Sequence, residues 1–158
     1  MAPFSKSGLA LLLMGAATAA SAADIREGQW VLNRSRSILP VRRDQLLSIV
    51  RARGTDFVFT IAQSDRNGPV TILGWSGRLD NVARPVWGAP MTMAISSSPT
   101  YDLSISGRTA DGQAFEEHCR QNATRDRLRC TGRRSGRPPT QYVEDYDWKA
   151  PNAVTFGR

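Results

Sequence analysis

Histidine and cysteine, the residues on which many catalytic and metal sites depend, are scarce in this 158-residue chain. His118 is the only histidine, and Cys119 and Cys130 are the only cysteines. Zinc usually takes four protein ligands, so two thiols leave ligands missing and argue against a zinc site. The cysteines do not form a Cys-x-x-Cys redox motif, and no glycine-rich phosphate loop is present. We therefore predict no metal, no cofactor and no enzymatic activity.

A long hydrophobic run is also missing. The longest apolar stretch, residues 9–20, is shorter than the ~20 residues that a membrane-spanning helix needs. Lys6 precedes it and small residues at 20–23 follow it, a pattern typical of a cleaved secretory signal peptide. The alternative is an amphipathic first helix or a retained anchor. The predicted division is a signal peptide over 1–23, a folded domain over 24–149 with no transmembrane segment, and a flexible C-terminal tail over 150–158. This division predicts a periplasmic or secreted protein.

In an exported chain, two cysteines most simply form a disulfide, Cys119–Cys130. The spacing places them on two adjacent strands, around a turn at residues 122–126. If they lie directly opposite each other, Phe115 and Leu128 share their face. The outer pairs that this register predicts are Arg120 with Arg129 and Glu116 with Arg133.

Lysine is nearly absent, although the chain carries a formal charge of +7. Lys6 and Lys149 are the only lysines, and arginine supplies the remaining positive charge. A tentative anion-binding surface comprises Arg120, Arg125, Arg127, Arg129, Arg133 and Arg134. Arginine recognises carboxylates and phosphates in a bidentate manner, so anionic envelope components or an acidic protein surface are candidate partners. Nucleic acid is a poor partner for an exported protein. The alternative is a solvated basic face neutralised by Glu144, Asp145 and Asp147.

Short segments of alternating polarity are what the sequence has in quantity, and no persuasive helical period accompanies them. Strands are predicted over 45–53, 56–64, 69–76, 91–96, 100–107, 113–121, 127–133 and 140–148, in addition to an opening strand at 28–33. Turn residues such as Asp111-Gly112 separate them. The fold class is therefore all-β, as a single antiparallel up-and-down barrel of about eight to nine strands. A β-sandwich is the alternative.

Alternation also predicts which side chains face the barrel interior. The candidate ligand-binding residues there are Phe57, Phe59, Met91, Met93, Tyr101 and Leu103. Segment 69–76 is apolar on both faces, which predicts a strand covered on both sides. His118 is expected at the surface. Glu144 shares a face with Tyr142, and a position at the barrel rim is favoured over an inward one.

The opening strand contains Gly28-Gln29-Trp30, and in this it resembles the lipocalin and calycin group, whose first strand carries a G-x-W motif. Trp30-x-Leu32-Asn33, with Ser35 and Ser37 behind it, is similar to small exported bacterial proteins of unknown activity. The resemblance implies a lipocalin-like barrel that binds a small apolar or amphiphilic ligand, although an eight-stranded barrel can equally be filled by its own side chains. We expect Trp30 to be structural, near a closed end, with Gly28 permitting close backbone approach.

Overall fold

The structure, a computed structural model, describes residues 25–65 and 68–150. The predicted signal peptide, and all but the first residue of the predicted tail, lie outside the described residues. No helix in the described part of the chain is long and apolar enough to cross a membrane.

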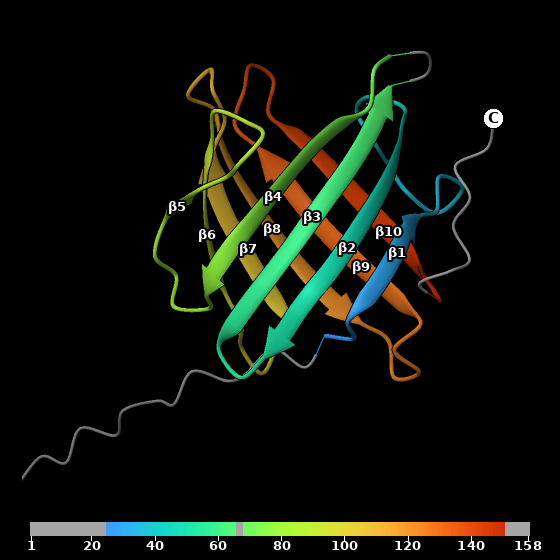
Figure 1. Cartoon of the computed structure of the whole chain (residues 1–158). Helices are drawn as coiled ribbons and strands as arrows, with labels where there is room; N and C mark the ends of the chain where they lie inside the picture. The colour runs from blue at the N-terminus through green and yellow to red at the C-terminus, as the bar shows by residue number, and fades with distance from the viewer. Residues whose placement is uncertain (1–24, 66–67, 151–158) are drawn as a thin grey trace, which may run out of the picture.

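In the part of the chain that the structure describes, ten strands form one antiparallel sheet that curls into a barrel (Figure 1). They are β1 (Gly28–Leu32), β2 (Arg43–Arg53), β3 (Asp56–Asp65), β4 (Thr71–Arg78), β5 (Arg84–Pro85), β6 (Thr92–Ser96), β7 (Leu103–Arg108), β8 (Ala114–Gln121), β9 (Arg127–Arg134) and β10 (Thr140–Lys149). Their order is β4-β3-β2-β1-β10-β9-β8-β7-β6-β5. Strands that are neighbours in the sheet are also consecutive in the sequence, except that β1, the first strand, pairs with β10, the last. The prediction of an all-β up-and-down barrel is confirmed, with the two-residue β5 raising the strand count.

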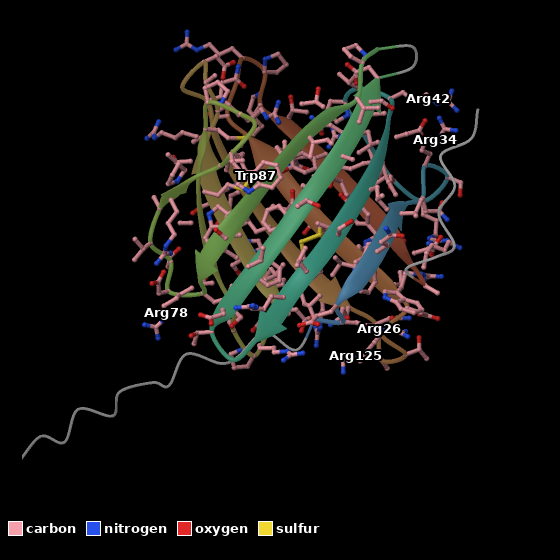
Figure 2. The ribbon with its side chains drawn as sticks, viewed as in Figure 1. Arg26, Arg34, Arg42, Arg78, Trp87 and Arg125 are labelled. Carbon is pink, nitrogen blue, oxygen red and sulfur yellow. A yellow bond between two sulfur atoms is a disulfide. The ribbon has the colours of Figure 1, made fainter. Side chains whose placement is uncertain are left out.

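The barrel seam lies between β4 and the segment that follows β5. Gly74 and Trp87 exchange two backbone hydrogen bonds, each with an N···O distance of 3.0 Å. A Cβ on residue 74 would lie 2.1 Å from an atom of the Trp87 indole, so only glycine lets the ring lie against the outside of β4 (Figure 2). The predicted two-sided cover of segment 69–76 is wrong, because Val70 and Ile72 are 58% and 54% exposed.

Trp30 lies in the core at the end of the barrel where the described chain enters. Its side chain is fully buried, and its Nε1 donates to the backbone oxygen of Arg26 over 3.1 Å. Ile25, also buried, belongs to the same cluster. Gly28 has φ +123°, and a Cβ there would lie 2.8 Å from the Trp148 indole nitrogen. This end of the barrel is therefore packed with side chains.

The polar residues of the W-x-L-N…S pattern, Asn33, Ser35 and Ser37, form the turn that follows β1. Asn33 Oδ1 accepts hydrogen bonds from Ser35 N, Ser35 Oγ and Arg36 N. Ser37 Oγ donates to the backbone oxygen of Asn33 and accepts from the backbone N–H of Asp145. These bonds hold the turn against the outer face of β10, where Asp145 is 1% exposed. In this chain the pattern therefore serves the junction between β1 and β10.

Candidate functional site

A cavity lies inside the barrel, bordered by every strand from β2 to β10 except the two-residue β5. Its apolar wall includes Leu47, Phe57, Phe59, Leu103, Ile105 and Leu128. Residues of the rim, including Val41, Asp65, Gln113 and Thr140, border it as well. These rim residues come from the strand ends and hairpins at the end opposite Trp30, at the top of Figure 1. The barrel is therefore packed at one end and hollow towards the other.

Five of the six predicted interior residues border the cavity: Phe57, Phe59, Met91, Met93 and Leu103. The predicted interior position of Tyr101 is wrong. β7 begins only at Leu103, so strand alternation does not fix the direction of Tyr101. Its ring stacks on His118 outside the barrel, with centroids 4.5 Å apart. His118 Nδ1 lies 3.1 Å from Ser104 Oγ, which places the only histidine on the outer face, as expected.

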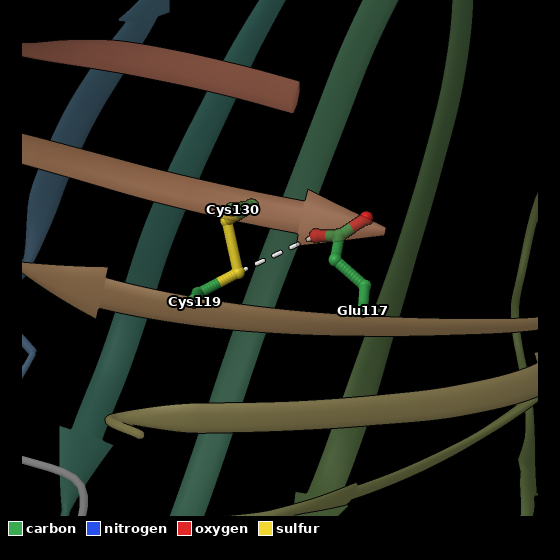
Figure 3. A group of neighbouring side chains, drawn as sticks. All are labelled: Glu117, Cys119 and Cys130. Atoms are coloured by element: carbon green, nitrogen blue, oxygen red, sulfur yellow. Dashed lines mark hydrogen bonds between the residues drawn. A yellow bond between two sulfur atoms is a disulfide. The ribbon is translucent and has the colours of Figure 1, made fainter. Parts of the chain in front are cut away.

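The disulfide forms part of the cavity wall (Figure 3). Cys119 and Cys130 are directly opposite each other on β8 and β9, and both are 2% exposed. The same register pairs Arg120 with Arg129 and Glu116 with Arg133, as the sequence predicted. One carboxylate oxygen of Glu117 and the two sulfur atoms lie within 4.8 Å of one another. Because the sulfurs are bonded to each other, they do not offer the thiolates that a metal ion would need.

A polar network occupies one side of the cavity, between β2 and β10. Arg43 pairs with Glu144, whose carboxylate also accepts from the Tyr146 hydroxyl. Gln45 Nε2 donates to Tyr146 Oη over 2.5 Å. Burial first, and then the charge of Glu144, raises the pKa of Tyr146 well above its usual range, so the phenol keeps its proton. The rim position predicted for Glu144 is wrong, since its side chain points inward and is 4% exposed.

A second inward acid, Glu117, is held by Tyr142 across a glycine. The Tyr142 hydroxyl donates to Glu117 Oε2 over 2.9 Å. Gly132 is the β9 partner of both residues, and a Cβ there would lie 2.2 Å from Tyr142 Cζ. The phenol ring can therefore cross the β9 backbone only because residue 132 has no side chain. A glycine within a strand is the available sequence signal for such a close approach, but it does not say which ring approaches.

The environment of Glu117 favours the protonated acid. Burial is the largest cause and the charge of Glu144 the second, and they raise the pKa of Glu117 to about 8, against the lowering effects of Tyr142 and Arg43. Oε1 lies 3.4 Å from Cys119 Sγ, the contact drawn in Figure 3. A disulfide sulfur carries no hydrogen, so the protonated carboxyl is the only possible donor in this contact. Among the described residues, Glu117 forms no ion pair.

The arginines on the outer face are largely engaged by acids of neighbouring strands. Arg133 donates twice to Glu116 Oε2, over 2.9 and 2.6 Å. Arg129 Nη1 lies 3.3 Å from Asp145 Oδ2, and Arg127 Nε lies 3.9 Å from Asp145 Oδ1. These contacts favour the alternative in which acidic strand residues neutralise the basic face.

The other three predicted anion-binding arginines lie apart. Arg134 borders the cavity near its mouth, and Arg125 lies at the opposite end of the barrel (Figure 2). Arg120 is exposed on the outer face, opposite Arg129. The structure therefore does not bring the six arginines together as one surface.

The sequence matches no protein-family profile and no curated protein. Among solved structures, the chain is similar to a de novo designed fluorescence-activating β-barrel, with 11% sequence identity and a TM-score of 0.46. The alignment covers 81% of this chain and 97% of the designed one. The resemblance to lipocalins rests on the residues quoted above and stays a prediction.

Proposed function

We propose that this protein binds a small apolar or amphiphilic ligand inside its barrel. The observation that supports this most directly is the cavity itself, since the barrel is hollow where its own side chains could have filled it. Apolar side chains line most of the wall, and polar groups gather on one side and at the rim, an arrangement typical of small-molecule sites. An exported location is part of the proposal, supported by the leader-like first residues and by the disulfide.

Titration with the neutral fluorophore N-phenyl-1-naphthylamine, excited directly, tests this proposal. Saturable binding with a fluorescence increase is expected. Ile105→Trp should weaken binding about tenfold or more, because its indole would occupy the cavity. Ser106→Trp is the matched control, since Ser106 is the next residue of β7 and is exposed on the outer face.

Two results together would remove the proposal. One is the lack of saturable binding by the folded wild-type protein, and the other is the lack of any copurified small molecule in native mass spectrometry. Equal affinities of the wild type and Ile105→Trp would place the probe elsewhere on the protein. The alternative role, a basic surface for anionic partners, stays a prediction.

A further inference from the structure

The acidic side chains that border the cavity outnumber the basic ones. Two carboxyl groups, Glu117 and Glu144, point into the cavity from β8 and β10. Arg43 is the cation beside them, and it already pairs with Glu144. Arg134 borders the cavity from the rim end of β9, where Asp65 also lies. Among the described residues, Glu117 therefore faces the cavity with a phenol and a disulfide beside it and no cation of its own.

We propose that the ligand is an amphiphilic amine, whose ammonium group is held by Glu117 while its apolar body lies against the aromatic and aliphatic wall. This inference rests on the proposed function and names the class of ligand. An ammonium group would supply a cation for Glu117 and would lie within hydrogen-bonding distance of its carboxylate. Hydrogen bonds between charged groups are stronger than those between neutral groups. The rings of Tyr142 and Phe115 also border the cavity, and aromatic faces attract organic cations.

The same groups disfavour an anionic head group. A ligand carboxylate beside Glu117 would meet two acids and a guanidinium that is already engaged by Glu144. A neutral alcohol could exchange hydrogen bonds with Glu117 but would form no charge-assisted hydrogen bond with it. The expected order of affinity for one alkyl chain is amine, then alcohol, then carboxylate.

Binding of the amine should release a proton. The free acid is mostly protonated near neutral pH, whereas the bound ammonium stabilises the carboxylate, so Glu117 loses one proton while the ligand keeps its own. The groups that face Glu117 are Tyr142, Glu144 and Tyr146 from β10, Arg43 from β2, and the disulfide of β8 and β9. Amine affinity should therefore rise by up to about tenfold per pH unit below pH 8 and level off above it.

The test is displacement of N-phenyl-1-naphthylamine by dodecylamine, dodecanol and dodecanoate at neutral pH, below their aggregation concentrations. We expect dodecylamine to bind at least about tenfold more tightly than dodecanol, as one charge-assisted hydrogen bond would give. Glu117→Gln should abolish this preference, chiefly by weakening dodecylamine binding. Glu116→Gln, the same change one residue away on the outer face, should keep the preference. Calorimetry in buffers of different ionisation enthalpy should show release of about one proton for the wild type and none for Glu117→Gln.

Each failure has a distinct meaning. Saturable probe binding with dodecanol or dodecanoate equal to dodecylamine would overturn the amine assignment and leave the proposed function standing. A preference for dodecylamine that survives Glu117→Gln, or binding without proton release, would also overturn it. If the probe does not bind and native mass spectrometry finds no copurified small molecule, the proposed function fails first.

Discussion

Glu117→Gln should stabilise the protein at neutral pH and leave its stability almost unchanged in acid. The wild-type carboxyl has a pKa of about 8 in the folded state, against an ordinary value of 4.5. Between these values the folded state holds a proton that the unfolded state has lost, so the free energy of unfolding falls as the pH rises. Below pH 4.5 both states hold the proton and the effect vanishes.

The size of the effect follows from the shift in pKa. At 1.36 kcal/mol per unit, the acid destabilises the folded state by about 1 kcal/mol at pH 5 and by about 3 kcal/mol at pH 7. Glutamine is neutral at every pH and keeps an oxygen that can accept from Tyr142, so it removes this dependence. Urea unfolding at pH 4, 5 and 7, with the disulfide intact, measures the difference between variant and wild type.

The matched control is Glu116→Gln, whose parent side chain pairs with Arg133 on the outer face. It should destabilise by no more than about 1 kcal/mol, because exposed ion pairs contribute little. A Glu117→Gln effect that is equal at pH 4 and pH 7 would refute the reasoning, since the carboxyl would then titrate alike in both states.

Three further variants test the packing that shapes the site. Trp30→Ala should cost about 3–5 kcal/mol in urea unfolding, because the indole is fully buried, and an unchanged midpoint would contradict its place in the core. Asp145→Asn should cost about 3 kcal/mol, because the buried carboxylate meets Arg36 and Arg129. The control Asp44→Asn, in an exposed pair with Arg34, should cost less than about 1 kcal/mol. Equal losses would count against a buried junction between the turn at 33–37 and β10. Gly132→Ala should displace the Tyr142 ring and remove the hydrogen bond that lowers the pKa of Glu117, so that this pKa rises further above its ordinary value, which carboxyl titration by NMR would detect; an unchanged titration would show that Tyr142 does not need the glycine.

The sequence by itself determined which residues share a face. Alternation along a strand is a local property, so Phe57 with Phe59 and Tyr142 with Tyr146 could be assigned without a partner strand. Two cysteines placed opposite each other then fixed the register of β8 and β9, including the pair of Arg120 and Arg129. The number and order of short strands sufficed for an antiparallel barrel.

Tertiary structure decided what each face meets. Tyr101 continues an alternating pattern, but the strand begins after it, and the ring finds His118 outside. Glu144 points inward because Arg43 and Tyr146 satisfy its carboxylate there, and both contacts depend on how the barrel closes. The approach of Tyr142 to Glu117 over Gly132 joins three strands. Alternation relates residues within one strand, whereas a cavity and its charges depend on side chains that only barrel closure brings face to face.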